Sequence, residues 1–227
     1  MTTPDVGPAV RVLLVDDEPL IRSGFRFILG LDPSIEIVGE ASDGGAAIEL
    51  VRAHRPDVVL MDVRMPGMDG PDATAVIVAE STSRVLAMTS LDAEGQLLRM
   101  LLAGATGYLL KDESPARITE AVHRTALGES VFSAHSAAQL VRRAVESEHG
   151  QGRQAAVERI SALTDRERDV AVRVASGETN HEIGAALHIS AGTVKTHLEQ
   201  VFAKLAVRNR VQVGVILERA GLGPADV

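Results

Sequence analysis

Segments that favour strands and segments that favour helices alternate five times over residues 9–128, and this alternation limits the possible folds more than any other feature. Short apolar runs typical of strands occupy residues 9–15, 35–39, 57–61, 84–88 and 106–110. Segments with apolar residues at helical spacing follow them, at residues 20–31, 45–53, 71–80, 93–103 and 114–127. A repeated strand–helix order predicts a parallel sheet with helices on both faces. The unbroken apolar run from Val12 to Val15 agrees, because the strands of such a sheet are buried on both sides.

The rest of the chain has a different pattern. Residues 146–154 (ESEHGQGRQ) are polar, contain glycine and lack large apolar residues, which is typical of a linker. Beyond them only helical patterns remain. We therefore expect an α/β domain over residues 9–128, a helical segment and flexible linker over 129–158, and a small all-α domain of four helices over 159–222.

Composition narrows the functional classes. Hydrophobic residues make up 45% of the 227 residues, and the absence of cysteine excludes disulfides, thiol catalysis and cysteine-bound metals. No apolar run approaches a membrane span and the first residues do not resemble a secretion signal, so a cytoplasmic protein without membrane contact is expected. The formal net charge of −8 is concentrated in residues 1–130, which carry −9, whereas residues 155–227 are neutral. This asymmetry suggests separate roles for the two parts.

A carboxylate ends one of the most apolar runs. In VVLMDVRMPGMDG, residues 58–70, the predicted strand leads directly into Asp62. Burying an unpaired charge is costly, so such a residue normally has a partner, a metal or a task. In a sheet of order 2-1-3-4-5, strands 1 and 3 are neighbours, and the first strand ends in Asp16 and Asp17. Three carboxylates at one edge need a cation, and hard oxygen ligands suit Mg²⁺.

A hydroxyl and an ammonium are expected at the same edge, because the fourth strand ends in Thr89 and the fifth in Lys111. Together with the carboxylates they would form a receptor for a phosphoryl group. A single aspartate at a strand end is more often a helix cap, but no packing rule asks for all these groups at four strand ends. A phosphatase with its own aspartyl-phosphate is the enzyme alternative. Such enzymes typically carry a second acid two residues after the nucleophile, where this chain has Arg64.

The residues around this constellation resemble the receiver domain of bacterial two-component response regulators, over about residues 9–128. The matching segments are VDDEP (15–19), MDVRMPGMDG (61–70), MTS (88–90) and GYLLK (107–111). The resemblance implies a flavodoxin-like, doubly wound sheet of order 2-1-3-4-5. It also implies that a sensor histidine kinase donates a phosphoryl group to Asp62, in a self-catalysed transfer that requires Mg²⁺.

The same resemblance implies a role for each neighbour of Asp62. The Mg²⁺ ligands would be Asp16 (through water), Asp17, Asp62 and the backbone carbonyl of Arg64. The phosphoryl-binding and switch residues would be Lys111, Thr89 and Tyr108, with the Thr89 hydroxyl moving to the phosphoryl group and Tyr108 turning inward. Many receivers have a cis peptide bond and a proline after the lysine, but here Asp112 follows, and a non-proline cis bond costs about 3 kcal/mol.

The all-α part carries helix-start signals at regular intervals. Thr164 with Glu167 and Thr179 with Glu182 read as capping boxes, and Ser190 is placed to cap a third helix. Helices are expected to span about residues 165–177, 180–187, 190–205 and 209–220. The tight turn at residues 188–190 is typical of a helix-turn-helix, whose later helix enters the major groove of DNA.

This part resembles the LuxR-type DNA-binding domain over about residues 159–222, most specifically in the segments TNHEIG and TVKTH. The residues expected to bind DNA are Asn180, Ser190, Thr193, Val194, Lys195, Thr196, His197 and Lys204. An apolar stripe on the last helix, Val207, Val211 and Val215, could serve either the core or a dimer. The neutral charge of this part counts against DNA binding, but residues 195–210 carry a net charge of +3. A four-helix protein-interaction module is the alternative.

The two resemblances together identify a response regulator of the NarL/FixJ type, a phosphorylation-controlled transcription factor rather than an enzyme for external substrates. Its expected partners are a histidine kinase, promoter DNA and, when phosphorylated, a second copy of the chain. In that family the unphosphorylated receiver covers the groove helix. The competing hypothesis is a receiver that acts by protein binding or without phosphorylation; the complete set of Asp16, Asp17, Asp62, Thr89 and Lys111 argues against the latter.

Overall fold

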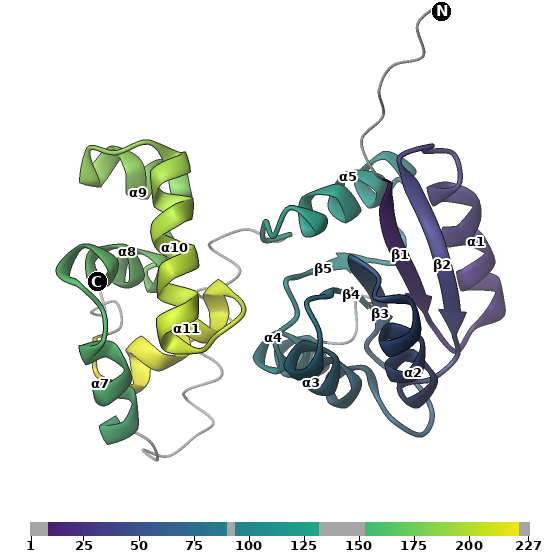
Figure 1. Ribbon diagram of the computed structural model, residues 1–227, viewed down its shortest axis with the longest axis horizontal. Helices are drawn as coiled ribbons and strands as arrows, with labels where there is room; N and C mark the ends of the chain where they lie inside the picture. Colours follow the sequence, from purple (N-terminus) through teal and green to yellow (C-terminus); the bar gives the residue numbers. More distant parts are fainter. Residues whose placement is uncertain (1–8, 90–93, 132–152, 223–227) are drawn as a thin grey trace, which may run out of the picture. The chain divides into compact units, whose positions relative to one another are not determined.

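The five apolar runs form one parallel sheet with the strand order β2-β1-β3-β4-β5 (Figure 1). The computed structural model describes residues 9–89, 94–131 and 153–222. The strands are β1 (Val10–Val15), β2 (Ile35–Ala41), β3 (Val58–Asp62), β4 (Arg84–Thr89) and β5 (Gly107–Leu110). All neighbouring strands run parallel. The predicted fold class and strand order are confirmed.

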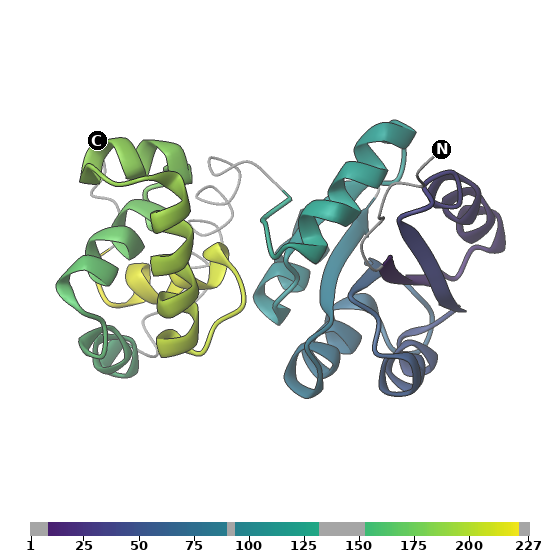
Figure 2. The same ribbon diagram turned by 45° about the horizontal axis from the view of Figure 1, so that its top comes forward.

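Helices cover both faces of the sheet, as the alternation predicted. They are α1 (Pro19–Leu29), α2 (Gly44–His54), α3 (Gly70–Glu80), α4 (Glu94–Ala103) and α5 (Pro115–Ala126). Helices α1 and α5 pack together on one face, and α2, α3 and α4 lie side by side on the other (Figures 1 and 2). Most observed ends lie within two residues of the predicted ones. Helix ends depend on local capping, such as the Asp43 side chain that accepts a hydrogen bond from the Ala46 N–H at the start of α2.

Aliphatic residues at the middle of the strands form the core of the sheet. Leu14 of β1 pairs in register with Leu60 of β3, and Leu60 pairs with Leu86 of β4. All three side chains are at most 1% exposed. Burial of aliphatic side chains on both faces holds the strand ends rigidly, and those ends carry the polar residues discussed below.

The chain returns to the edge of β5 after α5. Gly128 makes the turn with a φ of 75°, a conformation that side chains disfavour. The Tyr108 N–H then donates to the Val131 carbonyl at 3.2 Å. Gly107 allows this approach, because a Cβ at that position would lie 2.7 Å from the Val131 nitrogen. The last residue of the first unit is therefore fastened to the strand that carries Tyr108.

The chain divides into two compact units, residues 1–131 and 132–227. The described part of the second unit is helical, as predicted. Its helices are α7 (Arg153–Ser161), α8 (Asp165–Ala175), α9 (Asn180–Leu187), α10 (Ala191–Leu205) and α11 (Arg210–Arg219). Within the described residues, every helix is too short or too polar to cross a bilayer.

Helix α7 is an addition to the four helices expected in this unit. It begins inside the segment predicted as a linker, whose residues 146–152 lie outside the described part of the chain. Ala156 and Ile160 are 5% and 3% exposed and belong to the core of the unit. Only these two residues of α7 are buried, four positions apart, and so short a pattern is too weak for a helix to be recognised. The predicted domain boundaries stay a prediction.

The helix starts of the second unit follow the capping signals. Thr164 and Thr179 form complete capping boxes with Glu167 and Glu182. Ser190 caps α10 through a hydrogen bond from the Thr193 N–H at 3.0 Å. Between α9 and α10 the turn is tight, and Gly184 has no room for a side chain because a Cβ would lie 2.6 Å from the Ile189 carbonyl oxygen.

Candidate functional site

Three aspartates lie together at the carboxyl end of the sheet. Since β1 and β3 are neighbours, Asp16 and Asp17 after β1 and Asp62 at the end of β3 reach the same edge. One carboxylate oxygen from each lies within 4.8 Å of the others. Asp16 and Asp62 are buried, at 0% and 6% exposure, whereas Asp17 is exposed. The cluster therefore joins two buried carboxylates to one that faces solvent.

Lys111 supplies the positive charge of this cluster. Its ammonium lies 2.7 Å from Asp16 Oδ2 and 3.0 Å from Asp62 Oδ2. The backbone N–H of Lys111 donates a hydrogen bond to the backbone carbonyl of Thr89 at 2.9 Å, and this bond joins the ends of β4 and β5. Thr89 is buried and Tyr108 half-buried. The structure thus brings the groups from four strand ends to one edge of the sheet.

Burial and charge shift the titration of this pair in defined directions. Burial raises the pKa of Asp62 above its ordinary value, although hydrogen bonding and charge from Lys111 oppose this rise. Burial lowers the pKa of Lys111, but the nearby carboxylates of Asp16 and Asp62 outweigh this effect, so that the pKa of Lys111 is raised overall. Lys111 therefore remains a fixed positive charge beside Asp62 at neutral pH.

The backbone after Asp62 holds its carboxylate in place. The Val63 N–H donates to Asp62 Oδ1 at 2.8 Å, which leaves Oδ2 toward Lys111. The turn then folds back, and the Gly70 N–H donates to the Val63 carbonyl at 3.3 Å. A Cβ at Gly70 would come 2.1 Å from the Asp62 carbonyl oxygen, so only glycine fits there. This close approach explains the glycine at the end of MDVRMPGMDG.

The donor set fits a hard divalent cation. Asp16 Oδ1 accepts from the Glu18 N–H at 2.9 Å. Asp16 Oδ2 is within ion-pair distance of Lys111, yet no described group gives it a well-aligned hydrogen bond. Mg²⁺ takes a few carboxylate oxygens and keeps several waters, which suits one exposed and two buried carboxylates. Arg64, whose backbone carbonyl was predicted as a further ligand, is exposed two residues beyond Asp62.

The sequence alone did not determine whether the peptide bond after Lys111 is cis or trans. It is trans, like every peptide bond of the described residues. A trans bond is expected before Asp112, because only proline makes the cis form inexpensive.

Most of the residues predicted to bind DNA lie at the starts of α9 and α10, and Lys204 lies in the last turn of α10. Thr193, Thr196 and the cap residue Ser190 are exposed, whereas Asn180, Lys195 and His197 are half-buried. The Ser190 and Thr193 hydroxyls lie 2.9 Å apart, and the Thr196 hydroxyl donates to the Gly192 carbonyl at 3.3 Å. The first turns of α10 therefore present a polar surface with one cation.

Val194 does not belong to this exposed surface, and its burial argues against the predicted DNA contact of its side chain. It is 0% exposed and part of the core of the second unit. With Leu198, Val201 and Leu205 it forms the buried face of α10, at the helical spacing of three to four residues. Its side chain faces away from the exposed polar groups beside it.

Lys204 forms an ion pair within the second unit. Its ammonium lies 2.6 Å from Glu167 Oε2 of α8. Glu167 is 6% exposed, and the same oxygen accepts from the Thr164 N–H at 2.8 Å. The hydrogen bond from Lys204, with that from Thr164, lowers the pKa of Glu167 from its ordinary 4.5 to about 2. The capping box already accounts for Glu167 in the sequence, so nothing there pointed to this second bond.

The valine stripe near the last helix is covered. Val207, Val211 and Val215 are 8%, 0% and 5% exposed. Their burial agrees with the core interpretation that the sequence left open. A dimer contact through these valines would require them to be uncovered, and it stays a prediction.

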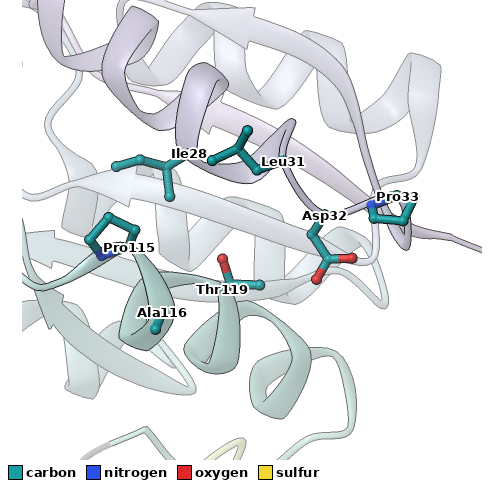
Figure 3. Close-up of a pocket in the computed structure, with 7 residues that line it drawn as sticks. All are labelled: Ile28, Leu31, Asp32, Pro33, Pro115, Ala116 and Thr119. Atoms are coloured by element: carbon teal, nitrogen blue, oxygen red, sulfur yellow. The ribbon is translucent and has the colours of Figure 1, made fainter.

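A shallow hollow of about 370 Å³ lies between α1 and α5 (Figure 3). It is lined by Ile28, Leu31, Asp32, Pro33, Pro115, Ala116 and Thr119. Asp32 is bonded to Ser34 and to His123, whose Nε2 lies 2.9 Å away, and the pKa of Asp32 is lowered to about 2, chiefly by His123. Since its carboxylate is already satisfied, the hollow has no uncommitted acid among its described lining residues.

Comparison with known proteins agrees with this division of the chain. Residues 12–123 match the family model described as the response regulator receiver domain, and residues 161–217 match that of bacterial regulatory proteins of the luxR family. The transcriptional regulatory protein NarL of Mycobacterium tuberculosis is 40% identical over 202 residues, 88% of this chain and 90% of that protein. The nitrate/nitrite response regulator NarP of Escherichia coli is 38% identical and covers 91% of this chain and 93% of its own.

Solved structures give the same result. The signal receiver domain of NarL from M. tuberculosis is 44% identical, with a TM-score of 0.52, over 54% of this chain and 100% of that one. The response regulator ChrA of a heme-sensing two-component system is 33% identical, with a TM-score of 0.52, over 95% of this chain and 100% of that one. The second match spans both units.

A receiver fold with an acid–lysine cluster, joined to a helix-turn-helix unit, is the architecture of a DNA-binding response regulator of a two-component system. The chain belongs to the NarL/FixJ-type family of these regulators, which has a LuxR-type DNA-binding domain. It is a phosphorylation-dependent, DNA-binding regulator of transcription, and its two domains imply a histidine kinase and DNA as partners. The match of the second unit to the luxR family thus favours a DNA-binding domain over the protein-interaction module.

Proposed function

We propose that Asp62 is the phosphoacceptor. The observation that carries this proposal is the position of its carboxylate, which is fixed at the end of β3 by Val63 and contacts Lys111 within the aspartate cluster. A carboxylate oxygen of Asp62 attacks the phosphorus of the kinase's phosphohistidine and forms a new O–P bond. The P–N bond breaks, and its electron pair stays on the imidazole nitrogen.

The neighbouring residues assist this self-catalysed transfer without being consumed. The Lys111 ammonium balances negative charge on the phosphoryl oxygens. Asp16, through water, Asp17, Asp62 and the Arg64 carbonyl would hold Mg²⁺. When bound, Mg²⁺ offsets the charge of carboxylates and phosphoryl group. The Thr89 hydroxyl moves to bind a phosphoryl oxygen. Tyr108, as the switch residue, turns inward in response to this movement.

The test is labelling by a small phosphodonor. Asp62→Asn should abolish Mg²⁺-dependent incorporation of label from radiolabelled acetyl phosphate, because an amide oxygen is a poor nucleophile. Asp112→Asn is the matched control: it makes the same change at an exposed residue next to Lys111 and should label like the parent chain. Equal labelling of the Asp62 variant would show that the acceptor lies elsewhere.

We propose further that α10 is the helix that reads DNA. Ser190, Thr193, Lys195, Thr196 and His197, with Asn180 at the start of α9, form the contact surface. Their exposed hydroxyls and the cation suit phosphate oxygens and base edges. The phosphorylated chain would bind as a homodimer to inverted half-sites about one helical turn apart, because a two-fold dimer mirrors its operator. It would act in the cytoplasm, where the promoter DNA lies. Its receiver domain would span residues 9–128 and its DNA-binding domain residues 159–222.

Lys195 tests this surface. If its ammonium contacts a phosphate, Lys195→Ala should weaken binding evenly across sequences and reduce the slope of log K against log salt by about one unit. Arg168→Ala removes a cation from an exposed position of α8 and should leave the slope unchanged. The measurement is a set of binding titrations at several salt concentrations. A slope that Lys195→Ala does not alter would place Lys195 off the DNA backbone.

A further inference from the structure

The first turn of α8 contacts both helices of the helix-turn-helix. Glu167 Oε2 accepts from the Lys204 ammonium at 2.6 Å, in the last turn of α10. The neighbouring Arg166 side chain donates to the Leu187 carbonyl at 2.7 Å, at the end of α9. A single turn of α8 therefore fixes the end of each helix of the motif.

The charges of the Glu167–Lys204 pair suit their positions. Glu167 lies in the first turn of α8, near the positive end of that helix dipole, and Lys204 lies in the last turn of α10, near its negative end. Glu167 is 6% exposed, so water competes weakly for its bond. The bond is charge-assisted and short, the kind of contact that restricts an angle as well as adding stability.

We propose that Glu167 and Lys204 are positioning residues for DNA recognition, which set the angle at which α10 presents its reading residues. The inference rests on the proposal that α10 is the reading helix. Lys204 lies nine residues after Lys195, which is about 14 Å along a helix axis. A tilt of a few degrees at the Lys204 end thus moves the reading end by about 1 Å, enough to spoil aligned hydrogen bonds to bases.

Two simpler roles for these residues make opposite predictions. If Lys204 is a phosphate contact, its removal lowers the salt slope and weakens binding to all DNA equally. If Glu167 acts only through its charge, its neutralisation strengthens DNA binding, because an acid in the DNA-binding unit repels phosphates. A positioning pair instead loses sequence-specific binding when either partner is removed.

The experiment uses the full chain treated with acetyl phosphate and two duplexes: one selected by the parent chain from a random-sequence library, and one of mixed sequence. Glu167→Gln keeps the capping box, in which glutamine also serves. It should weaken binding to the selected duplex by about tenfold, the equivalent of one charge-assisted hydrogen bond. Binding to the mixed duplex and the salt slope should not change. Asp169→Asn, at an exposed position of the same helix, is the matched control and should keep the preference for the selected duplex.

Lys204→Met tests the pair from the other side and leaves the capping box intact. It should reproduce the loss of preference for the selected duplex. The double variant, Glu167→Gln with Lys204→Met, should bind the selected duplex no more weakly than either single variant. Lys204→Arg should bind it like the parent chain, because arginine keeps a cation near Glu167. A merely structural role would lower binding to both duplexes alike. Equal weakening on both duplexes would overturn the proposal. Tighter DNA binding by Glu167→Gln, or a lower salt slope in Lys204→Met, would overturn it as well. Lys195→Ala, run in parallel, reports separately whether α10 contacts DNA.

Discussion

Two glycines, which have no functional side chain, help to hold Asp62 in place. Gly70 stands where the chain returns beneath the end of β3, and a Cβ there would lie 2.1 Å from the Asp62 carbonyl oxygen. Gly44 is similarly confined, since a Cβ would lie 2.8 Å from the Met68 carbonyl oxygen. The position of Asp62, the proposed phosphoacceptor, therefore depends on small residues in the loop after β3 and at the start of α2, as well as on its charged neighbours.

This packing predicts opposite effects for two glycine substitutions. Gly70→Ala must displace backbone and should lower the free energy of unfolding by about 1–3 kcal/mol, the usual cost of overpacking. Gly24→Ala, in the exposed part of α1 with no atom within 4 Å of its Cβ, should raise that free energy by about 0.5–1 kcal/mol. Urea unfolding of both variants measures the effects. If Gly70→Ala proves as stable as the parent, the loop does not press on Asp62 in the way described.

The residues of the aspartate–lysine cluster could be found in the sequence because each ends a strand with a strong apolar signal. Parallel strands bring their ends to one edge, so local patterns, together with the strand order that the family resemblance implied, were enough to place Asp16, Asp62 and Lys111 together. The bond between Glu167 and Lys204 could not be found in this way. Its partners are 37 residues apart and on helices whose packing angle no local pattern encodes.

At the scale of single elements, capping signals predicted the starts of α8, α9 and α10 in the second unit, whereas periodicity did not indicate α7 there. Thr164, Thr179 and Ser190 mark the starts of α8, α9 and α10 because a side-chain cap is a local interaction. Helix α7 has no such mark and was missed; packing of Ala156 and Ile160 against the rest of the unit stabilises it. The inward face of α10, which includes Val194, becomes clear only once the whole helix is placed against its neighbours.

The bond that joins α8 to α10 predicts a pH dependence. The pKa of Glu167 is lowered in the folded state from 4.5 to about 2, so its contribution to stability is present above pH 4.5 and is lost as the pH falls toward 2. At neutral pH we expect Glu167→Gln to be less stable by on the order of 1–3 kcal/mol. The gap should close over that acidic range, because protonated Glu167 resembles glutamine.

Thermal unfolding of the parent chain and Glu167→Gln, followed from neutral pH to pH 2, measures this gap. Other acids, such as Asp32, titrate in both chains and cancel in the difference. A gap that stays constant over the range would mean that the carboxylate of Glu167 is not held by Lys204 as the structure indicates.

For the whole molecule, the question is how phosphorylation of one unit changes DNA binding by the other. The first unit carries the excess negative charge and the aspartate cluster, and the second carries the helix-turn-helix. The chain leaves the first unit hydrogen-bonded to Tyr108 through Val131. The proposed response of Tyr108 to phosphorylation would therefore occur next to the residue at which the first unit ends. Such a signal acts by shifting the population of two states of the chain.

The most direct test is one set of DNA titrations, on the selected duplex, with and without acetyl phosphate. It compares the full chain, its Asp62→Asn variant and a fragment that begins at Arg153, so that α7 is kept. We predict that acetyl phosphate tightens binding by the full chain by about 5- to 150-fold, the usual range of allosteric coupling. The Asp62 variant should not respond, and the fragment should bind without phosphodonor. If the untreated full chain binds as tightly as the fragment, or if the Asp62 variant responds like the parent, phosphorylation of Asp62 does not control DNA binding.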